Sequence, residues 1–391
     1  MKLKIELSAS QREQQNEFRE FVDSEIIPFA DQFDRDERLP TALISRIAEK
    51  GYLAATIPEK SGGRGMAMIT HGLLCEELGR GSASLLSLFT VHGMLAHALM
   101  QWGSPEQRSF WLPKLACGKS IGAFGLSEPN IGSDAKNVET AAELTGDSYL
   151  LNGTKKWISC GQIADIFLII AQCEGEPTAF LVEGNTPGFK RKPIGGMMGF
   201  KAAMLAELHF DNCAIPKENL VGRKGFGFSH VAATALDYGR YCVAAGCTGL
   251  AQACLEACLS YTGERQQFGT FLKNHQLIQR MLADMITNIQ AARLLYWQAG
   301  YLKDMIDPDS IISSATAKYF ASTMVAKVAS DAVQIHGANG CSEDYPLQRY
   351  FRDAKIMEII EGSNQMQQIM ISKYAGMSAR RERRKDVPSK G

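Results

Sequence analysis

Apolar residues recur at three- and four-residue intervals along the first third of the chain, which is the periodicity of amphipathic helices. Residues suited to helix starts precede these periodic runs, namely Ser8, Pro40, Thr70 and Ser84. The run that follows Ser84 is almost continuously apolar. The pattern predicts an N-terminal helical domain over residues 1–119.

The periodicity changes at Ile121. Short runs rich in β-branched and aromatic residues follow, separated by Gly, Asn, Asp and Pro, and such runs are typical of strands joined by turns. In the segment LNGTK, Asn152–Gly153 suits the tight turn of a β-hairpin. These features predict a central antiparallel β domain, a small barrel or sandwich, over residues 120–228.

Long helical patterns return from Phe228 onward. Their length and apolar spacing predict an antiparallel four-helix bundle over residues 229–376. The last residues, 377–391, carry mixed charge with an excess of basic side chains and predict a solvated, flexible tail. The expected fold class is therefore α+β and mainly α, with an N-terminal helical domain, a central β domain and a C-terminal bundle.

Charge and composition narrow the classes of function. The 391 residues include 42 Lys and Arg and 42 Asp and Glu, so the formal net charge is zero. A neutral chain lacks a general attraction to nucleic acid or to an anionic membrane. We expect no uncharged stretch near the roughly 18 apolar residues that a membrane-spanning helix needs. The N-terminus does not resemble a secretory or transit signal. These points predict a soluble cytoplasmic protein.

The ten cysteines, without a secretory signal, indicate reduced thiols. Four of them fall on one expected helix: Cys242, Cys247, Cys254 and Cys258. At a rise of about 1.5 Å per residue the ends of this set are about 24 Å apart, so the four thiols cannot share one tetrahedral metal. We expect small buried apolar residues there and no metal site.

Five motifs spread along the chain carry a resemblance to a known family. They are GLSEPNIGSDAKN (125–137), NGTKKWISCG (152–161), ERQQFG (264–269), QIHGANGC (334–341) and RDAKIMEIIEGSNQ (352–365). In this order and spacing they resemble the acyl-CoA dehydrogenase superfamily. The resemblance implies an FAD-dependent oxidoreductase that performs α,β-dehydrogenation of an acyl thioester. A carboxylate removes the α-proton and flavin N5 accepts the β-hydride.

The resemblance also implies which residues contact FAD. Leu126 and Ser127 match contacts to the pyrimidine edge of the flavin, Trp157 packs against its ring, and Ser159 donates near N5. The segment around Arg265 reaches the FAD of a neighbouring subunit. The full set of implied cofactor contacts is Phe124, Leu126, Ser127, Trp157, Ser159, Arg265, Gln267, Phe268, Gln334, Gly337, Gly340, Ser363 and Gln365. The implied substrate contacts are Gly132, Ser133, Tyr238, Gly239, Arg240 and Gly362.

Glu361 stands between an apolar run and Gly362. By its position alone it is either a catalytic base or a charge that ends a helix. In the family that the chain resembles, the base lies in this loop or on a bundle helix, at the position matched here by Gly239. Glycine cannot remove a proton, so the resemblance implies that Glu361 is the base. The flanking isoleucines predict that desolvation raises its pKa.

The resemblance leaves the substrate carrier and the electron acceptor open. The stretch LDYGRYCVAAG around Gly239 is similar to dehydrogenases of polyketide and nonribosomal peptide pathways, so a small acyl group on CoA competes with one on an acyl carrier protein. Electrons would pass to an electron-transfer flavoprotein or to oxygen. A homotetramer, or a dimer, is implied. The alternatives are a flavin-dependent oxidase or monooxygenase on the same fold and a non-catalytic flavin- or thioester-binding scaffold.

Overall fold

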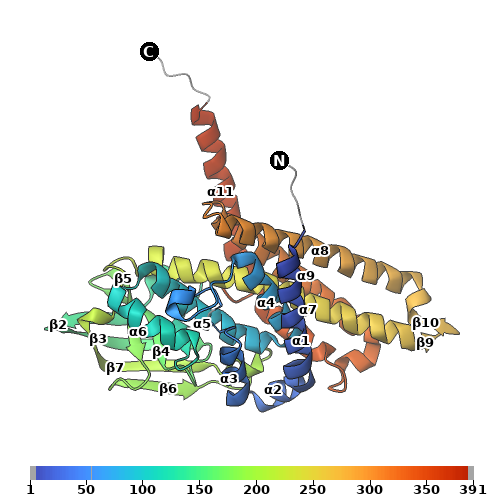
Figure 1. Cartoon of the computed structure of the whole chain (residues 1–391), viewed down its shortest axis with the longest axis horizontal. Helices are drawn as coiled ribbons and strands as arrows, with labels where there is room; N and C mark the ends of the chain where they lie inside the picture. Colours follow the sequence, from blue (N-terminus) through green and yellow to red (C-terminus); the bar gives the residue numbers. More distant parts are fainter. Residues whose placement is uncertain (1–5, 54, 386–391) are drawn as a thin grey trace.

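The computed structural model describes residues 6–53 and 55–385, with side chains described as far as Ala375. A sheet domain lies at one end of the molecule, and long helices extend from it to the other end (Figure 1). The predicted class is confirmed, because a helical region, a β-sheet region and a second helical region follow one another along the chain.

The N-terminal helices are α1 (Ala9–Glu25), α2 (Ala30–Asp36), α3 (Thr41–Glu49), α4 (Met68–Gly81), α5 (Ala83–Trp102) and α6 (Pro105–Ala116). Ser8 caps α1, and its side chain accepts from the Gln11 N–H in a capping box. The start predicted at Ser84 is two residues late, because Ser82 caps α5. Thr70 lies inside α4. Helices α4 and α5 are buried along almost their whole length.

Two helices are long and apolar enough to span a membrane by length and composition, namely α5 and the continuous helix Gly227–Glu264. The expectation that no uncharged stretch reaches this length is therefore wrong, since α5 has no Asp, Glu, Lys or Arg. In both helices most of the apolar window is buried within the protein, 89% and 78% respectively. Packing inside the fold accounts for their apolar character.

The central strands are β1 (Gly122–Gly125), β2 (Ala141–Thr145), β3 (Ser148–Ile158), β4 (Ile166–Cys173), β5 (Glu176–Glu183), β6 (Phe189–Pro193), β7 (Ala206–Pro216) and β8 (Leu220–Val221). They form one sheet in the order β6-β7-β3-β2-β4-β5-β8, with β1 beside β4. Most neighbours are antiparallel, but β1 and β2 pair with β4 in parallel. The sheet places the end of β1 next to β3, which brings two of the sequence motifs together.

The hairpin turn predicted at Asn152–Gly153 is wrong. Both residues lie within β3, where the register with β7 shifts between Leu151 and Gly153. The β2–β3 hairpin turns instead at Gly146–Asp147. Gly153 has φ +145, and a Cβ there would lie 2.7 Å from the Cα of Thr140, so the glycine allows a bulge and a close approach.

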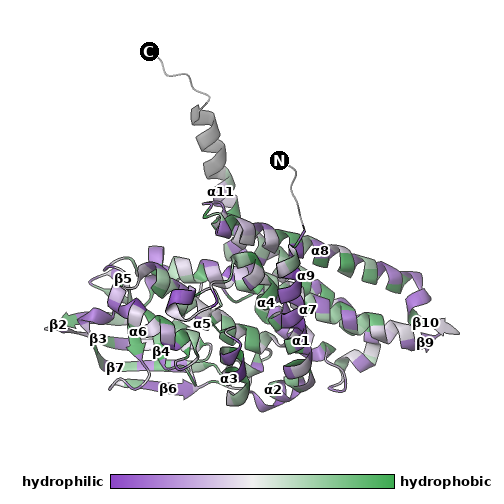
Figure 2. Ribbon diagram, in the orientation of Figure 1, coloured by the Kyte–Doolittle hydropathy of each residue, from purple (hydrophilic) through white to green (hydrophobic). Residues whose placement is uncertain are grey.

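The C-terminal region comprises a π-helical turn (Gly227–Ala232), α7 (Ala233–Glu264), the hairpin β9 (Gln266–Gln267) and β10 (Thr270–Phe271), α8 (Gln276–Asp304), α9 (Ser310–His336), α10 (Leu347–Met357) and α11 (Asn364–Lys385). Helix α7 packs against α4, α5, α8 and α9 and is the central helix of the molecule. Helix α8 alternates hydrophobic and hydrophilic residues along its length (Figure 2). All ten cysteines are free thiols.

Helix α11 projects away from the rest of the molecule (Figure 1). Its backbone continues to Lys385, so the described part of the predicted tail is helical, and its flexibility stays a prediction. Residues 386–391 lie outside the described residues.

Candidate active site

Glu361 occupies the turn between α10 and α11 and adopts a left-handed conformation, with φ +55, followed by Gly362 with φ +84. This turn aims the carboxylate at α7. A Cβ placed on Gly239 would lie 2.4 Å from Glu361 Oε2 and 2.6 Å from its Cδ. The carboxylate therefore fills the space that any other residue at position 239 would need.

The Glu361 carboxylate is held in an apolar pocket. Its Oε2 is buried and accepts no hydrogen bond from any described residue. Burial raises its pKa from 4.5 to about 7. The positive charges of Arg240 and Lys318 oppose this rise, whereas Cys242 adds to it. The side chain is thus a carboxylate without a partner, which is unusual in a protein interior.

The backbone carbonyl and the backbone N–H of Glu361 differ in their hydrogen bonding. Its carbonyl oxygen accepts from Arg240 Nε at 3.3 Å and from Gln367 Nε2 at 3.2 Å. Its N–H has no acceptor among the described residues. The turn therefore ties down the carbonyl and leaves one hydrogen-bond donor free beside the carboxylate.

A small cavity of about 30 Å³ lies next to Glu361. Its wall is formed by α5, the residue after β3, the segment between β6 and β7, α7 and the turn itself: Leu86, Ser87, Thr90, Val91, Ser159, Phe200, Val243, Ile360 and Glu361. Ser87 Oγ donates to Ser159 Oγ at 3.0 Å. Thr90 Oγ1 is buried without a partner. The implied flavin-side residue Ser159 and the implied base thus share one cavity.

The two β-domain motifs are joined by a buried ion pair. Lys155 Nζ lies 2.6 Å from Glu128 Oε1 and donates to the Leu126 carbonyl at 3.1 Å. The backbone N–H of Lys156 donates to the Ser127 carbonyl at 2.9 Å. Burial lowers the pKa of Lys155 to about 8, although the Glu128 carboxylate opposes that change. This pair fixes Leu126 and Ser127 beside the strand that carries Trp157.

Trp157 is 49% exposed and has φ +64. A left-handed backbone is strained for a bulky residue, and such strain gathers at binding sites. Phe124 and Leu126 are buried near the end of β1, and Ser127 is partly buried. Gly132 and Ser133 are exposed, and no atom lies within 4 Å of a Cβ built on Gly132, so a ligand could pass close to this backbone.

Other predicted cofactor residues lie away from Glu361. Arg265, Gln267 and Phe268 are exposed on the hairpin at the far end of the helices (Figure 1), with Phe268 97% exposed. Gln334 and Gly337 lie at the exposed end of α9. The two segments are linked, since His336 stacks on Tyr261 of α7 with ring centroids 4.1 Å apart.

Some of the predicted residues also have a structural role within the chain. A Cβ on Gly340 would lie 2.7 Å from the Val333 carbonyl oxygen, so this glycine is needed for close packing within the chain. Ser363 Oγ accepts from the Met366 N–H at the start of α11, and Gln365 is exposed. Gly362 carries the turn after Glu361.

Tyr238 was expected to contact substrate, but it is 1% exposed and does not line the cavity at Glu361. Its ring stacks on His71 and His97, and its hydroxyl lies against Gly93. One residue along an α-helix turns a side chain by about 100°, so Tyr238 points into the packing between helices while Gly239 faces Glu361.

A histidine and two cysteines meet in the buried contact between α4 and α7. His71 Nε2 lies 3.4 Å from Cys242 Sγ and 3.6 Å from Cys75 Sγ, and the three atoms lie within 4.8 Å of one another. These are the distances of sulfur–nitrogen hydrogen bonds. Burial opposes ionisation of Cys242, but the hydrogen bond from Cys75 and the charge of His71 lower its pKa to about 6. Hydrogen bonding accounts for the cluster.

Several cavity residues were absent from the sequence prediction. They are Leu86, Ser87, Thr90, Val91, Phe200 and Val243. Ser87 and Thr90 lie three residues apart on α5, so they share one helix face. Two hydroxyls on one face of a mostly apolar buried helix were the available signal.

The chain is similar to known proteins along most of its length. Family models for the N-terminal, middle and C-terminal domains of acyl-CoA dehydrogenases match residues 8–119, 123–213 and 225–376. The chain is 37% identical over 374 residues to the short-chain specific acyl-CoA dehydrogenase of rat mitochondria, covering 94% of this chain and 90% of the relative.

Solved structures share the fold. Butyryl-CoA dehydrogenase from Megasphaera elsdenii has a TM-score of 0.91 at 34% identity, covering 95% of this chain and 100% of that one. The prolyl acyl carrier protein oxidase AnaB has a TM-score of 0.90 at 26% identity, covering 95% and 100%. The chain therefore belongs to the acyl-CoA dehydrogenase family, whose members are oxidoreductases that bind FAD.

Proposed function

We propose that Glu361 is the base that removes the α-proton of an acyl thioester during α,β-dehydrogenation. The observation that carries this proposal is the carboxylate itself, whose Oε2 is buried without a partner among the described residues, which lines a cavity and whose pKa is raised to about 7 by burial. A desolvated carboxylate is a stronger base toward a weak carbon acid than one in water. Gly239 leaves it the room to reach the cavity.

The free N–H of Glu361 would donate to the thioester carbonyl oxygen. Negative charge develops on this oxygen as the α-proton leaves, and a fixed backbone donor stabilises it. Because the Glu361 carbonyl is tied to Arg240 and Gln367, the peptide plane is held and the N–H keeps its direction. The base and the carbonyl donor would thus come from one residue.

The residues around the cavity fit FAD. Trp157 presents an exposed indole on a strained backbone, and Ser159 places a hydroxyl in the same cavity as Glu361. When bound, FAD supplies the hydride acceptor. Leu126 and Ser127 would hold the pyrimidine edge of the ring, and Trp157 would pack beside it. On the same proposal, Arg265, Gln267, Phe268, Gln334, Gly337, Ser363 and Gln365 would hold the remainder of the cofactor.

We propose a short acyl group as substrate. The cavity beside Glu361 is small, and Leu86, Val91 and Val243 close it with branched side chains. The rat relative is named as short-chain specific, and one solved neighbour is a butyryl-CoA dehydrogenase. Gly132, Ser133 and Arg240 would guide the thioester arm. The names of the rat and Megasphaera elsdenii proteins support CoA as the carrier. The likeness to AnaB supports an acyl carrier protein as the competing carrier.

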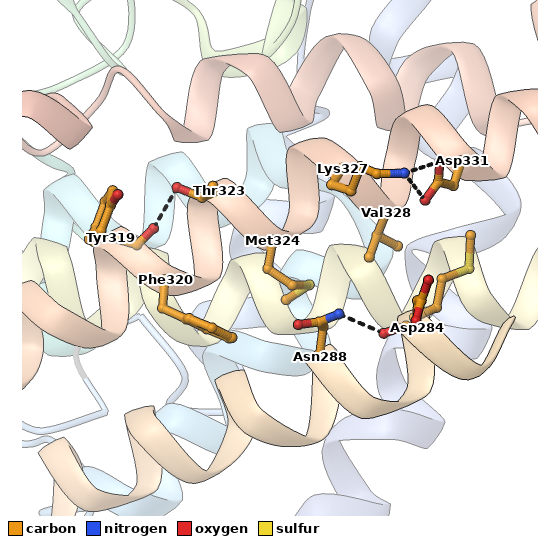
Figure 3. A pocket seen from close by; sticks show the side chains of 10 residues that line it. Asp284, Asn288, Tyr319, Phe320, Thr323, Met324, Lys327, Val328 and Asp331 are labelled. Atoms are coloured by element: carbon orange, nitrogen blue, oxygen red, sulfur yellow. Dashed lines mark hydrogen bonds and ion pairs between the residues drawn. The ribbon is translucent and has the colours of Figure 1, made fainter. Parts of the chain in front are cut away.

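Assembly into a homotetramer, or a dimer, is supported by the outer face of α8 and α9. A groove of about 330 Å³ runs between these helices (Figure 3), and Met285, Phe320, Met324 and Val328 line it with apolar side chains. Leu277, Ile286 and Leu294 are exposed along α8. An exposed apolar face of this kind is typical of an interface between subunits. Phe268, almost fully exposed at the hairpin, would reach the cofactor of a second copy.

The proposed function leaves two candidate electron acceptors and one proposed location. An electron-transfer flavoprotein and oxygen are both compatible with the site, and the named oxidase among the solved neighbours supports testing oxygen directly. We propose a cytoplasmic location on the reduced thiols, since all ten cysteines are free.

The test is anaerobic flavin reduction by the purified FAD-bound protein. A panel of propionyl, butyryl, hexanoyl and octanoyl groups is offered on CoA and on a carrier protein. We expect butyryl-CoA to bleach the flavin fastest. Bleaching with carrier-protein substrates alone would favour the acyl carrier protein, and no bleaching with any thioester would contradict the proposed dehydrogenation.

A further inference from the structure

Lys318 is a lysine of α9 that is completely buried. Its Nζ donates to the Glu358 carbonyl at 3.2 Å, to the Gly362 carbonyl at 3.1 Å and to Asn364 Oδ1 at 3.0 Å. An ammonium group has three donors, and all three are used. The acceptors all belong to residues 358–364, the turn that has Glu361 at its centre.

The turn needs an external anchor. Glu358 follows the last residue of α10, so its carbonyl lacks a helical partner, and Asn364 opens α11. Between them Glu361 and Gly362 both have positive φ, which is unfavourable for a glutamate. Lysine on a neighbouring helix joins the two sides of the turn and fixes the residue between them.

Asn364 extends this anchor. Its Oδ1 also accepts from Ser322 Oγ at 2.7 Å, and its Nδ2 donates to Thr323 Oγ1 at 3.2 Å. Its backbone N–H donates to the Glu358 carbonyl at 3.0 Å. Both polar atoms of the Asn364 side chain are therefore tied to α9, and among their described partners Lys318 carries the positive charge.

We propose that Lys318 is a positioning residue for the dehydrogenation, which holds the turn so that the Glu361 carboxylate faces Gly239 and whose positive charge favours the ionised base. The inference rests on the proposed role of Glu361. It adds a second ionisable group, remote from the substrate, on which the rate depends.

The charges around the two groups set the expected pH dependence. Glu361 faces Arg240 and Cys242 of α7 and Lys318 of α9. Lys318 faces Cys247 and Arg240 of α7, Glu361, and Glu358 at the end of α10. Burial lowers the pKa of Lys318 to about 8, and the charges of Cys247, Glu361 and Glu358 oppose that change while Arg240 adds to it.

The protonation of Glu361 and that of Lys318 change the rate in opposite directions as pH increases. Glu361 acts when it has lost its proton, so the rate rises as pH increases through about 7. Lys318 acts when it keeps its proton, because a neutral amine has two donors for three acceptors. The rate therefore falls as pH increases through about 8. A narrow bell-shaped profile of kcat/KM is expected for the wild-type enzyme.

The experiment measures anaerobic flavin reduction by butyryl-CoA from about pH 5 to about pH 10, a range that spans both expected pKa values. The enzymes compared are wild type, Lys318→Met and Ser322→Ala. Methionine keeps the length of the side chain and removes its charge. We expect Lys318→Met to lose the alkaline fall, to shift the rise to higher pH and to reduce the rate at least about tenfold. Ser322→Ala removes a hydrogen bond to the same asparagine without removing a charge, so both limbs should stay in place.

Several results would overturn the inference. A Lys318→Met enzyme with the wild-type profile excludes the role of the charge, and a wild-type profile without a fall near pH 8 excludes it without any variant. If Lys318→Met does not retain FAD, Lys318→Gln provides amide donors without charge and must still shift the rise. The proposed function is judged separately: if Glu361→Gln reduces flavin like wild type, the base assignment fails, whatever Lys318 does.

Discussion

Glu361 and Gly239 form a matched pair, because the carboxylate of one occupies the position that a side chain on the other would require. The two residues come from the turn after α10 and from the first part of α7, which are far apart in the sequence. Their contact places a base candidate in a cavity that also contains Ser159.

Gly239→Ala should disable the site while leaving the fold intact. The new methyl group would lie 2.4 Å from Glu361 Oε2 and 3.1 Å from Met94 Sδ, so the carboxylate must move. We expect flavin reduction by butyryl-CoA to slow at least about tenfold, since small displacements of a catalytic group are costly. Gly263→Ala on the same helix is the control, because no atom lies within 4 Å of its Cβ. Equal rates in both variants would show that the contact does not matter.

The FAD-free protein should become less stable as pH rises from about 4.5 to 7. Glu361 has a higher pKa when folded than when unfolded, so the folded state binds its proton more tightly and loses this advantage as pH increases. Glu361→Gln removes the effect, and at pH 8 it should stabilise the protein by up to about 3 kcal/mol, with little change below pH 4.5. Urea denaturation at both pH values measures this difference, and a uniform shift would contradict it.

Thr90→Val should stabilise the FAD-free protein. The Thr90 hydroxyl is buried and has no partner in the described part of the chain, and valine has nearly the same shape. Removing an unsatisfied buried polar group is worth about 1 kcal/mol or more. Thr248→Val is the matched control, because that hydroxyl donates to the Ala244 carbonyl at 3.1 Å. Its loss should lower the stability of the protein. Destabilisation of Thr90→Val would show that its hydroxyl has a partner.

Arg265→Ala should weaken FAD retention without changing the stability of the FAD-free chain. The side chain is exposed at the end of α7, whereas Glu361 contacts Gly239 near the start of that helix, and we propose that Arg265 binds the cofactor of a neighbouring subunit. Loss of a charge-assisted hydrogen bond of about 1.5–3 kcal/mol corresponds to roughly tenfold weaker binding or more. Lys273→Ala removes an exposed basic residue from the same end of the molecule as a control. FAD content after dilution and gel filtration gives the answer.

The motifs in the sequence predicted the fold class and brought Glu361, Gly239 and Ser159 into one hypothesis. Helical periodicity was informative because the helices are long and have buried faces. The Asn152–Gly153 turn was wrong because a sheet bulge and a hairpin turn both use glycine with positive φ, and only the pairing partner separates them. Tyr238 was misplaced because a motif does not show which helix face a neighbouring residue occupies.

Other parts of the site depend on contacts between distant segments. Lys318 lies 40 to 46 residues before the groups that it holds, as the separations of its hydrogen bonds show. Part of the cavity wall beside Glu361 comes from α5, a mostly apolar helix that has no catalytic motif. Such residues are chosen by packing in three dimensions, which the periodicity of one sequence does not contain.

Anaerobic flavin reduction by butyryl-CoA in Glu361→Gln tests the central claim most directly. Glutamine keeps the size of the side chain and removes its capacity to take a proton, so the FAD spectrum should be retained. The account predicts that reduction slows by roughly 10²–10⁴-fold, the usual contribution of a general base. Reduction near the wild-type rate in a variant that still binds FAD would contradict the account.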